Sequence, residues 1–144
     1  MDIKAKEKEI FDKLGNIDQN IIEDGIVSEE EYLDSKYKIL YIMKEVNGGA
    51  GWNLKKFLYK GGRPQTWDNI ARWTEGLLNI NQEYNWSYLE GNNENRRKYY
   101  LKKIGVINLK KTSGGYTSNY KEISMAAFEN RNLIKTQVDL YNPD

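Results

Sequence analysis

The strongest strand signal in this chain is the stretch KILYIMKEVNGGAGW at residues 38–52. Its apolar run over Ile39–Val46, with β-branched residues near both ends, predicts a buried β-strand. The strand delivers a carboxylate, Glu45, and an amide, Asn47, into a glycine-rich turn. In open α/β sheets, ligands bind in the crevice beyond the carboxyl ends of the strands. We therefore expect a functional site at the end of this strand, with Glu45 and Asn47 on its floor.

The composition is that of a folded domain. A chain of 144 residues is long enough for a single domain, 1–144, with a buried core. Charged residues make up 30% of it, but four Trp, eleven Tyr and three Phe argue against disorder, because chains that cannot fold are usually poor in aromatics. The formal net charge of +1 gives no strong electrostatic signal for or against nucleic acid.

Two residue types are missing, and their absence excludes several chemistries. Without cysteine there is no disulfide, thiol nucleophile or thiolate metal site. Without histidine there is no Ser-His-Asp or Cys-His arrangement and no imidazole-bound zinc or iron. Acid–base chemistry must therefore come from Asp, Glu, Lys or Tyr, and we expect no metal and no cofactor.

Targeting signals are also missing from the sequence. The charged residues 1–7 do not form a signal peptide, and no apolar run approaches the length of a membrane span. We expect a cytoplasmic protein without a membrane partner.

The remaining elements are predicted from capping residues, helical spacing and breaks at glycine. The N-terminal helical segment, at about 1–36, contains a helix over Ile3–Leu14 ended by Gly15 and a brief helix capped by Ser28. After the strand Ile39–Val46 come a helix capped by Asn53, a longer helix capped by Thr66 and a surface loop over Asn81–Asn95. The rest of the chain is predicted as a helix over Arg96–Lys102, a second buried strand over Lys103–Leu109, a turn over Lys110–Tyr116, and a final helix from Ser118 or Asn119 to Val138.

This order of elements predicts an α/β fold in which helices flank a short parallel sheet. Two strands make a small sheet, and the turn at Asn142-Pro143-Asp144 is of the kind that leads into a further strand, which we expect after Asp144. We expect Trp67 and Trp73, on the longer helix, to pack in the core.

Three segments resemble the uracil-DNA glycosylase-like superfamily. The sequence KEVNG at 44–48 resembles the loop after the first strand in its bacterial and archaeal branch. The sequence VINLK at 106–110 resembles the strand whose terminal Asn reads a pyrimidine edge. The end of the last helix, QVDLYNPD at 137–144, resembles the helix before the third strand. The resemblance covers about Ile39–Asp144 and implies the N-terminal part of a three-layer α/β/α fold.

The chain departs from that family in several places. Lys44 stands where the loop motif has Gly, and Asn47 where it has Pro. The iron–sulfur cysteines of that branch and the second catalytic motif, which carries a His, are absent from the sequence. The resemblance therefore implies the fold more strongly than the activity.

The resemblance implies a role for each of the strand-end residues. A glycosylase holds a base taken out of the stack, reads its edge and clamps its face. Glu45 and Asn47 would be catalytic, with Glu45 acting on the attacking water. Asn108 would bond the pyrimidine edge, with Trp52 or Phe57 stacking on the base. The DNA backbone would lie on Gly48, Gly49, Gly51, Lys110, Lys111, Ser113, Gly114 and Gly115, and Lys55, Lys56, Lys60 and Arg63 would extend this footprint.

Other interpretations of these residues stay open. Glu45 can be an ion-paired carboxylate with Lys44 or Lys110, and Asn108 can cap the turn that follows it. The missing His motif favours a non-catalytic binding module for nucleic acid or protein on the same scaffold. An exposed sheet edge also invites pairing with another chain, so that a homodimer would complete the sheet.

Overall fold

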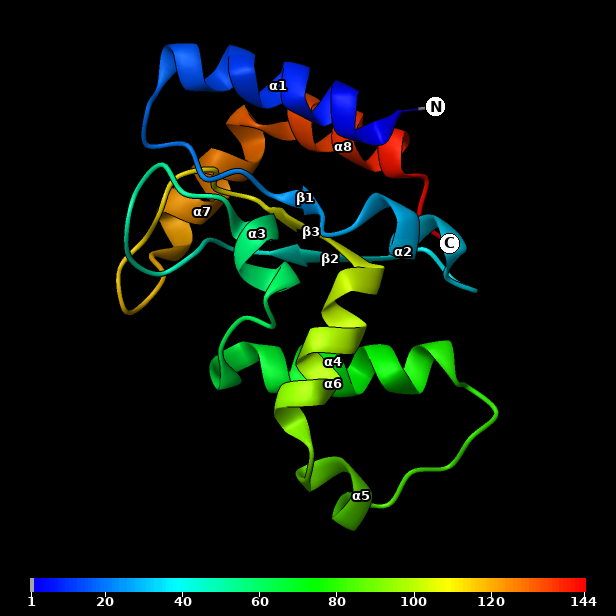
Figure 1. Ribbon diagram of the computed structural model, residues 1–144. Helices are drawn as coiled ribbons and strands as arrows, with labels where there is room; N and C mark the ends of the chain where they lie inside the picture. The colour runs from blue at the N-terminus through cyan, green and yellow to red at the C-terminus, as the bar shows by residue number, and fades with distance from the viewer. Residues whose placement is uncertain (1) are drawn as a thin grey trace.

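The computed structural model describes residues 2–144 and confirms the predicted α/β class (Figure 1). The elements are α1 (Ile3–Ile17), β1 (Gly25–Ile26), α2 (Glu29–Asp34), β2 (Ile39–Met43), α3 (Leu54–Tyr59), α4 (Pro64–Leu78), α5 (Trp86–Glu90), α6 (Asn93–Tyr100), the 3-10 helix η1 (Leu101–Lys103), β3 (Ile104–Asn108), α7 (Tyr120–Glu129) and α8 (Arg131–Tyr141). Among residues 2–144, no helix is both long enough and apolar enough to cross a membrane.

The sheet has three strands in the order β1-β3-β2. β2 and β3 are parallel, as expected, with Ile39 opposite Ile104 and Met43 opposite Asn108. β1 pairs with β3 in the antiparallel direction. The prediction missed β1, because two residues are too few to show an alternating pattern.

The prediction that the first strand is buried is wrong. All five residues of β3 are buried, but β2 lies at the edge of the sheet and is only partly covered. Ile42, for example, is 53% exposed. β2 also ends at Met43 instead of Val46. A continuous apolar run fits an edge strand here because both of its faces contact helices while its outer edge stays open.

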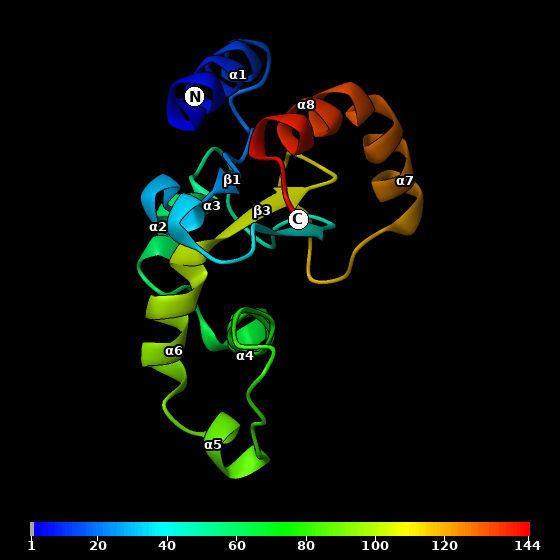
Figure 2. The ribbon, with the colours of Figure 1, turned by 90° about the vertical axis from the view of Figure 1, so that its right-hand side faces the viewer.

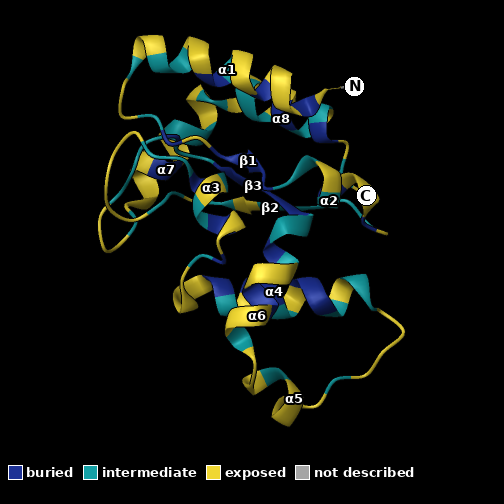
Figure 3. Cartoon of the chain, in the orientation of Figure 1, coloured by how far each residue is buried: buried dark blue, intermediate teal, exposed yellow. Residues whose placement is uncertain are grey.

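Two cores lie on opposite faces of β3. Ile104 and Val106 point into a core with α3, α4 and η1, whereas Ile107 points into a core with α1 and α8. This alternation follows from the two-residue period of a strand. Figures 1 and 2 show α1 and α8 on one side of the sheet and α4, α5 and α6 on the other. Figure 3 shows the buried residues concentrated in β1, in β3 and on the inward faces of the helices, with β2 only partly covered.

The helices α4, α5 and α6 form an arm that is held together by a buried ion pair. Arg96 Nε lies 2.6 Å from Glu75 Oε2, and both side chains are 4% exposed. Tyr88 from α5 donates a hydrogen bond of 2.6 Å to the other oxygen of Glu75. The predicted surface loop over Asn81–Asn95 is therefore wrong in part: it contains α5, whose N-cap Asn85 accepts a hydrogen bond from the Tyr88 backbone N–H, and the start of α6.

Several helix boundaries differ from the predicted ones. α1 continues through Gly15, because a single glycine weakens a helix without ending it. Thr66 does not cap α4: it has a φ of 70° inside the first turn, and regular helix begins at Trp67. Asn53 and Asn119 are N-caps as predicted, but the final helix is divided at Asn130 into α7 and α8.

Of the two tryptophans predicted for the core, only one is there. Trp67 is 7% exposed and belongs to the core beneath α3, whereas Trp73 is 58% exposed. Their separation of six residues places them on different faces of α4, and only one of those faces meets the sheet.

Candidate functional site

The loops that follow β2 and β3 are held side by side by backbone hydrogen bonds. Leu109 N–H donates to Met43 C=O at 2.9 Å, and Lys110 N–H donates to Lys44 C=O at 3.0 Å. Further along, Gly114 N–H donates to Val46 C=O at 2.8 Å. The parallel ladder therefore continues past both strand ends, and Figure 1 shows the two loops leaving the sheet together. This is the edge at which the strand order predicts a site.

A cavity of about 400 Å³ opens at this edge. Its wall comes from both loops, from α3 and from the start of α4. The lining residues are Met43, Glu45, Val46, Asn47, Trp52, Leu54, Phe57, Arg63, Thr66, Trp67 and Asn108. All five residues proposed for catalysis and base binding line this one cavity, although they come from three separate parts of the sequence.

Asn108 is the most unusual residue of the cavity. The residue is 2% exposed, and its amide nitrogen Nδ2 is the one buried side-chain nitrogen or oxygen between residues 2 and 144 that lacks a hydrogen-bond partner. A buried donor without a partner costs about 1–3 kcal/mol. A group of this kind needs an acceptor, which an ordered water, an ion or a ligand can supply. The interpretation of Asn108 as a turn cap does not account for this side-chain donor.

A buried polar network fixes the backbone of Asn108 from behind. Its N–H donates to Asp24 Oδ2 at 2.7 Å, and the same oxygen accepts Lys111 Nζ at 2.7 Å. Gln137 of α8 donates to Asp24 Oδ1 at 2.8 Å and accepts from Lys111 at 2.8 Å. Burial lowers the pKa of Lys111, and the opposing charge of Asp24 works against this effect. The network positions the cavity floor without facing the cavity.

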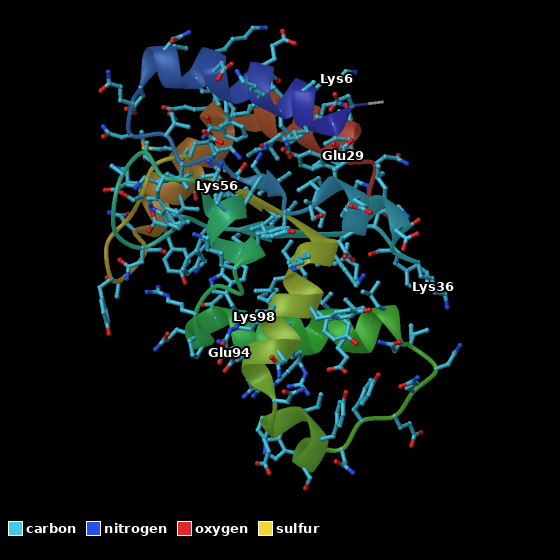
Figure 4. All side chains as sticks on the ribbon, in the orientation of Figure 1. Lys6, Glu29, Lys36, Lys56, Glu94 and Lys98 are labelled. Carbon is cyan, nitrogen blue, oxygen red and sulfur yellow. The ribbon has the colours of Figure 1, made fainter. Side chains whose placement is uncertain are left out.

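Lys111 is therefore not available to contact a phosphate, and the prediction that the DNA backbone would lie on it is wrong. Its side chain is 3% exposed and is bonded to Asp24, which is fully buried. The doublet Lys110-Lys111 looks like a basic surface cluster in the sequence, but the two side chains point in different directions. Lys55 is likewise paired with the buried Glu7 at 2.6 Å, which leaves Lys56 and Lys60 as the exposed lysines of the α3 region. Lys56 is labelled in Figure 4.

Glu45 lies at the cavity wall in contact with Lys110. Lys110 Nζ is 3.1 Å from Glu45 Oε2 and 3.5 Å from Glu122 Oε2, and the Glu45 side chain is 6% exposed. Burial lowers the pKa of Lys110, but the two carboxylates outweigh it and raise the pKa above its usual value. The ion-paired interpretation of Glu45 is thus correct, and the paired residue is one of those that line the cavity.

Glycine at position 114 allows this carboxylate to lie where it does. A Cβ atom on Gly114 would overlap with the carboxylate of Glu45, whereas a Cβ on Gly115 would meet nothing within 4 Å. Gly48, Gly49 and Gly51 have φ values of 75°, 72° and 63°, a region that favours glycine. Ser113 is half-buried beside Gly114.

Trp52 and Phe57 form an aromatic wall. Their ring centroids are 5.6 Å apart at 80°, an edge-to-face arrangement. Trp52 is held in place because its Nε1–H donates to Gly48 C=O at 3.1 Å. The tightly turned glycine loop thus orients one ring, and that ring supports the other.

Sequence reasoning missed Asp24, Gln137 and Thr66. Asp24 lies in the apolar stretch IIEDGIV at 21–27, and an acid inside such a stretch is a signal for a buried, bonded carboxylate. Thr66 reaches the cavity through the irregular first turn of α4, which no sequence pattern indicates.

Comparison of the chain with protein-family models, with curated proteins and with solved structures found no match. Within the described residues 2–144, no three Asp or Glu side chains lie close enough together to hold a metal ion. The geometry of the cavity is therefore the basis for assigning a function.

Proposed function

We propose that the cavity beyond β2 and β3 binds a pyrimidine base exposed from a DNA strand, as in the uracil-DNA glycosylase-like proteins that the sequence resembles. The observation that carries this proposal is the buried, unpartnered Nδ2 of Asn108 at the cavity floor. A carbonyl oxygen on the ligand would supply the missing acceptor, while the amide oxygen of Asn108 can accept from a ring N–H.

The other lining residues fit a flat, polar-edged ligand. The cavity volume of about 400 Å³ falls in the range of small-molecule sites. Trp52 and Phe57 offer apolar faces to the base, and Arg63, an exposed residue at the start of α4, lies where a strand phosphate would pass. Lys56 and Lys60 extend the positive charge along α3.

Glu45 and Asn47 are the groups that could act on the glycosidic bond. In hydrolysis, a water oxygen attacks the sugar C1′, the C1′–N bond breaks and its electron pair leaves with the base. A carboxylate at the position of Glu45 would take the proton from the water. A binding module would use the same cavity without this step, so base release distinguishes the two.

We expect Asn108→Ala to weaken binding of a single-stranded oligonucleotide with one uracil by about tenfold to a hundredfold, because one buried hydrogen bond to the base is lost. Fluorescence anisotropy of the labelled strand measures the change. The matched control is Asn132→Ala, an exposed residue of α8 outside the cavity. Urea unfolding of both variants shows whether the fold is kept.

Equal binding by Asn108→Ala and the wild type would contradict the proposed site. A second measurement on the same samples, mass spectrometry of free uracil, tests for catalysis. Release by the wild type that is lost in Glu45→Gln would make the protein a glycosylase. Binding without release would make it a binding module.

A second candidate, self-association, is favoured by the open edge of β2. Within the described residues β2 pairs with β3 alone, and an apolar cavity of about 530 Å³ runs along its outer side between β2, the end of α4 and α8. Ile42, Leu77 and Ile80 are 53%, 46% and 62% exposed there. A second copy adding its own edge strand would cover them.

We expect self-association through this edge to be abolished by Ile42→Lys, because a charged residue at a sheet edge opposes strand addition. Sedimentation velocity over a range of protein concentrations measures the effect, with Leu33→Lys on α2 as an equally exposed control at 50%. A wild-type chain that stays monomeric at the highest concentration would remove this candidate.

A further inference from the structure

A cavity of about 720 Å³, which we call the β1 cavity, lies beside β1 and shares no lining residue with the cavity at Asn108. Its walls come from α1, from the chain between Glu23 and Glu30, and from α3 with its two caps. Figure 1 shows α1, α2 and α3 placed around β1. A volume of this size falls in the range of small-molecule sites. The structure therefore holds a second place for a ligand.

Apolar side chains form part of the wall of the β1 cavity. Ile3 and Ile26 belong to it and are buried, while Tyr59 is 49% exposed. The buried carboxylate of Glu7 accepts a hydrogen bond from the Ile26 backbone N–H at 2.8 Å and pairs with Lys55 at 2.6 Å. The wall therefore offers apolar surface, and its buried charge is already balanced within the chain.

Three lysines that line the β1 cavity have no carboxylate partner. Lys4 lies on α1, Lys56 lies on α3, and Lys60 is the C-cap of α3. All three are exposed, and within residues 2–144 none of them forms an ion pair. Lys8, in contrast, is paired with Asp12. An ammonium group without a partner in the chain can bind an anion that the cavity takes up.

The glutamates of the β1 cavity are mostly engaged within the chain. Glu29 accepts hydrogen bonds of 3.0 and 3.1 Å from the first two N–H groups of α1, where the helix dipole also favours a negative charge. Glu23 accepts a hydrogen bond from Asn53. Among residues 2–144, Glu30 is the one glutamate of this lining that is left without such a partner. In total five lysines and four glutamates line the cavity, which is an excess of one positive charge.

We infer that the β1 cavity binds a small amphiphilic anion, a molecule with an apolar or aromatic body and one acidic group. The body would lie on Ile3, Ile26 and Tyr59, and the acidic group would lie among the three unpaired lysines. Lysine binds anions as a point charge with little demand on geometry, so a carboxylate or a sulfonate serves equally well as the acidic group. This site is separate from the one proposed for a pyrimidine base and does not depend on it.

Anilinonaphthalene sulfonate is a dye of this chemical class, and its fluorescence rises when it moves from water to an apolar site. We expect it to bind the wild-type protein at one saturable site. The triple variant Lys4→Ala/Lys56→Ala/Lys60→Ala should bind it about tenfold more weakly, since three exposed charge contacts are lost. Phenylnaphthylamine, which has the same body without the sulfonate, should bind both proteins equally.

Two matched controls test the charge and the location. Lys6→Ala/Lys36→Ala/Lys121→Ala removes three exposed lysines outside the cavity and should bind the dye as the wild type does. Ser28 lines the cavity, is half-buried and makes no side-chain hydrogen bond at its cap position, so Ser28→Trp fills the cavity without removing a bond. This variant should bind neither dye, whereas Ser118→Trp, a half-buried position outside the cavities, should bind both.

Two results would overturn the inference. Equal weakening by the two lysine triple variants would mean that the dye responds to the overall charge of the protein. Unchanged binding by Ser28→Trp, in a protein that urea unfolding shows to be folded, would place the dye at another apolar surface, such as the cavity along β2. If Ser28→Trp does not fold, the two triple variants decide the question. Neither result bears on the Asn108 cavity, whose test uses a uracil-bearing strand.

Discussion

Asp24→Ala is expected to lower the free energy of unfolding by about 3–5 kcal/mol, the usual result of removing one partner of a buried ion pair. Asp24 is fully buried and accepts hydrogen bonds from Asn108, Lys111 and Gln137. Its loss leaves the Lys111 ammonium buried without a counter-charge. Since domains are stable by only about 5–15 kcal/mol, this is a large fraction of the total. Urea unfolding followed by circular dichroism measures it.

The control for this variant is Asp12→Ala, which removes an exposed pair with Lys8 on α1 and should change the free energy of unfolding by less than about 1 kcal/mol. The pH dependence gives a second check. Burial already lowers the pKa of Lys111, and without Asp24 the folded pKa falls further. Between the folded and unfolded pKa values of Lys111, the unfolded chain then holds a proton that the folded variant has released, so the stability of the variant rises with pH. The loss of unfolding free energy in Asp24→Ala should therefore be largest near neutral pH and shrink as the pH rises toward about 10. If Asp24→Ala lowered the free energy of unfolding as little as Asp12→Ala, the buried network around Asp24 would not stabilise the fold as proposed.

Gly114→Ala is expected to lower the free energy of unfolding by about 1–3 kcal/mol, the cost of placing an extra methyl group in a packed site. That methyl would overlap with the carboxylate of Glu45. Either Glu45 must leave Lys110, or Gly114 must give up its hydrogen bond to Val46. In both cases the cavity wall changes shape, so binding of the uracil-bearing strand should weaken as well.

The neighbouring glycine gives a matched control. A Cβ on Gly115 would meet nothing, so Gly115→Ala should be close to neutral. The double variant Glu45→Ala/Gly114→Ala should regain most of the lost stability, because the smaller side chain at 45 makes room for the methyl group. An additive loss in the double variant would show that the carboxylate is not the group in conflict.

The general location of the candidate site could be predicted from the sequence because it depends on strand polarity. Two apolar runs that end in Glu45 and Asn108 predict parallel strands whose carboxyl ends meet at one sheet edge. The structure brings these residues together with Asn47, Trp52 and Phe57 around one cavity. Their roles toward a ligand remain predictions.

What supports the site could not be predicted, because it depends on contacts between distant segments. Asp24 precedes a strand of two residues, and its partners lie 84 to 113 positions away along the chain. The burial of Lys111 follows from those partners, so the sequence shows two adjacent lysines with no sign that they differ. The exposure of Ile42 depends in the same way on which strand lies at the sheet edge.

The link between Asp24 and Gln137 has a consequence for how the protein forms. Residues 113 positions apart must meet before the Asn108 backbone is held in place, because Asp24 is bonded to Gln137 of α8. Long-range contacts of this kind slow folding, since a large loop must close before they form. On the ribosome, both strands of the cavity would emerge well before α8. We therefore expect the cavity to acquire its final shape only when synthesis has passed α8, so that a nascent chain without that helix would not yet bind a base.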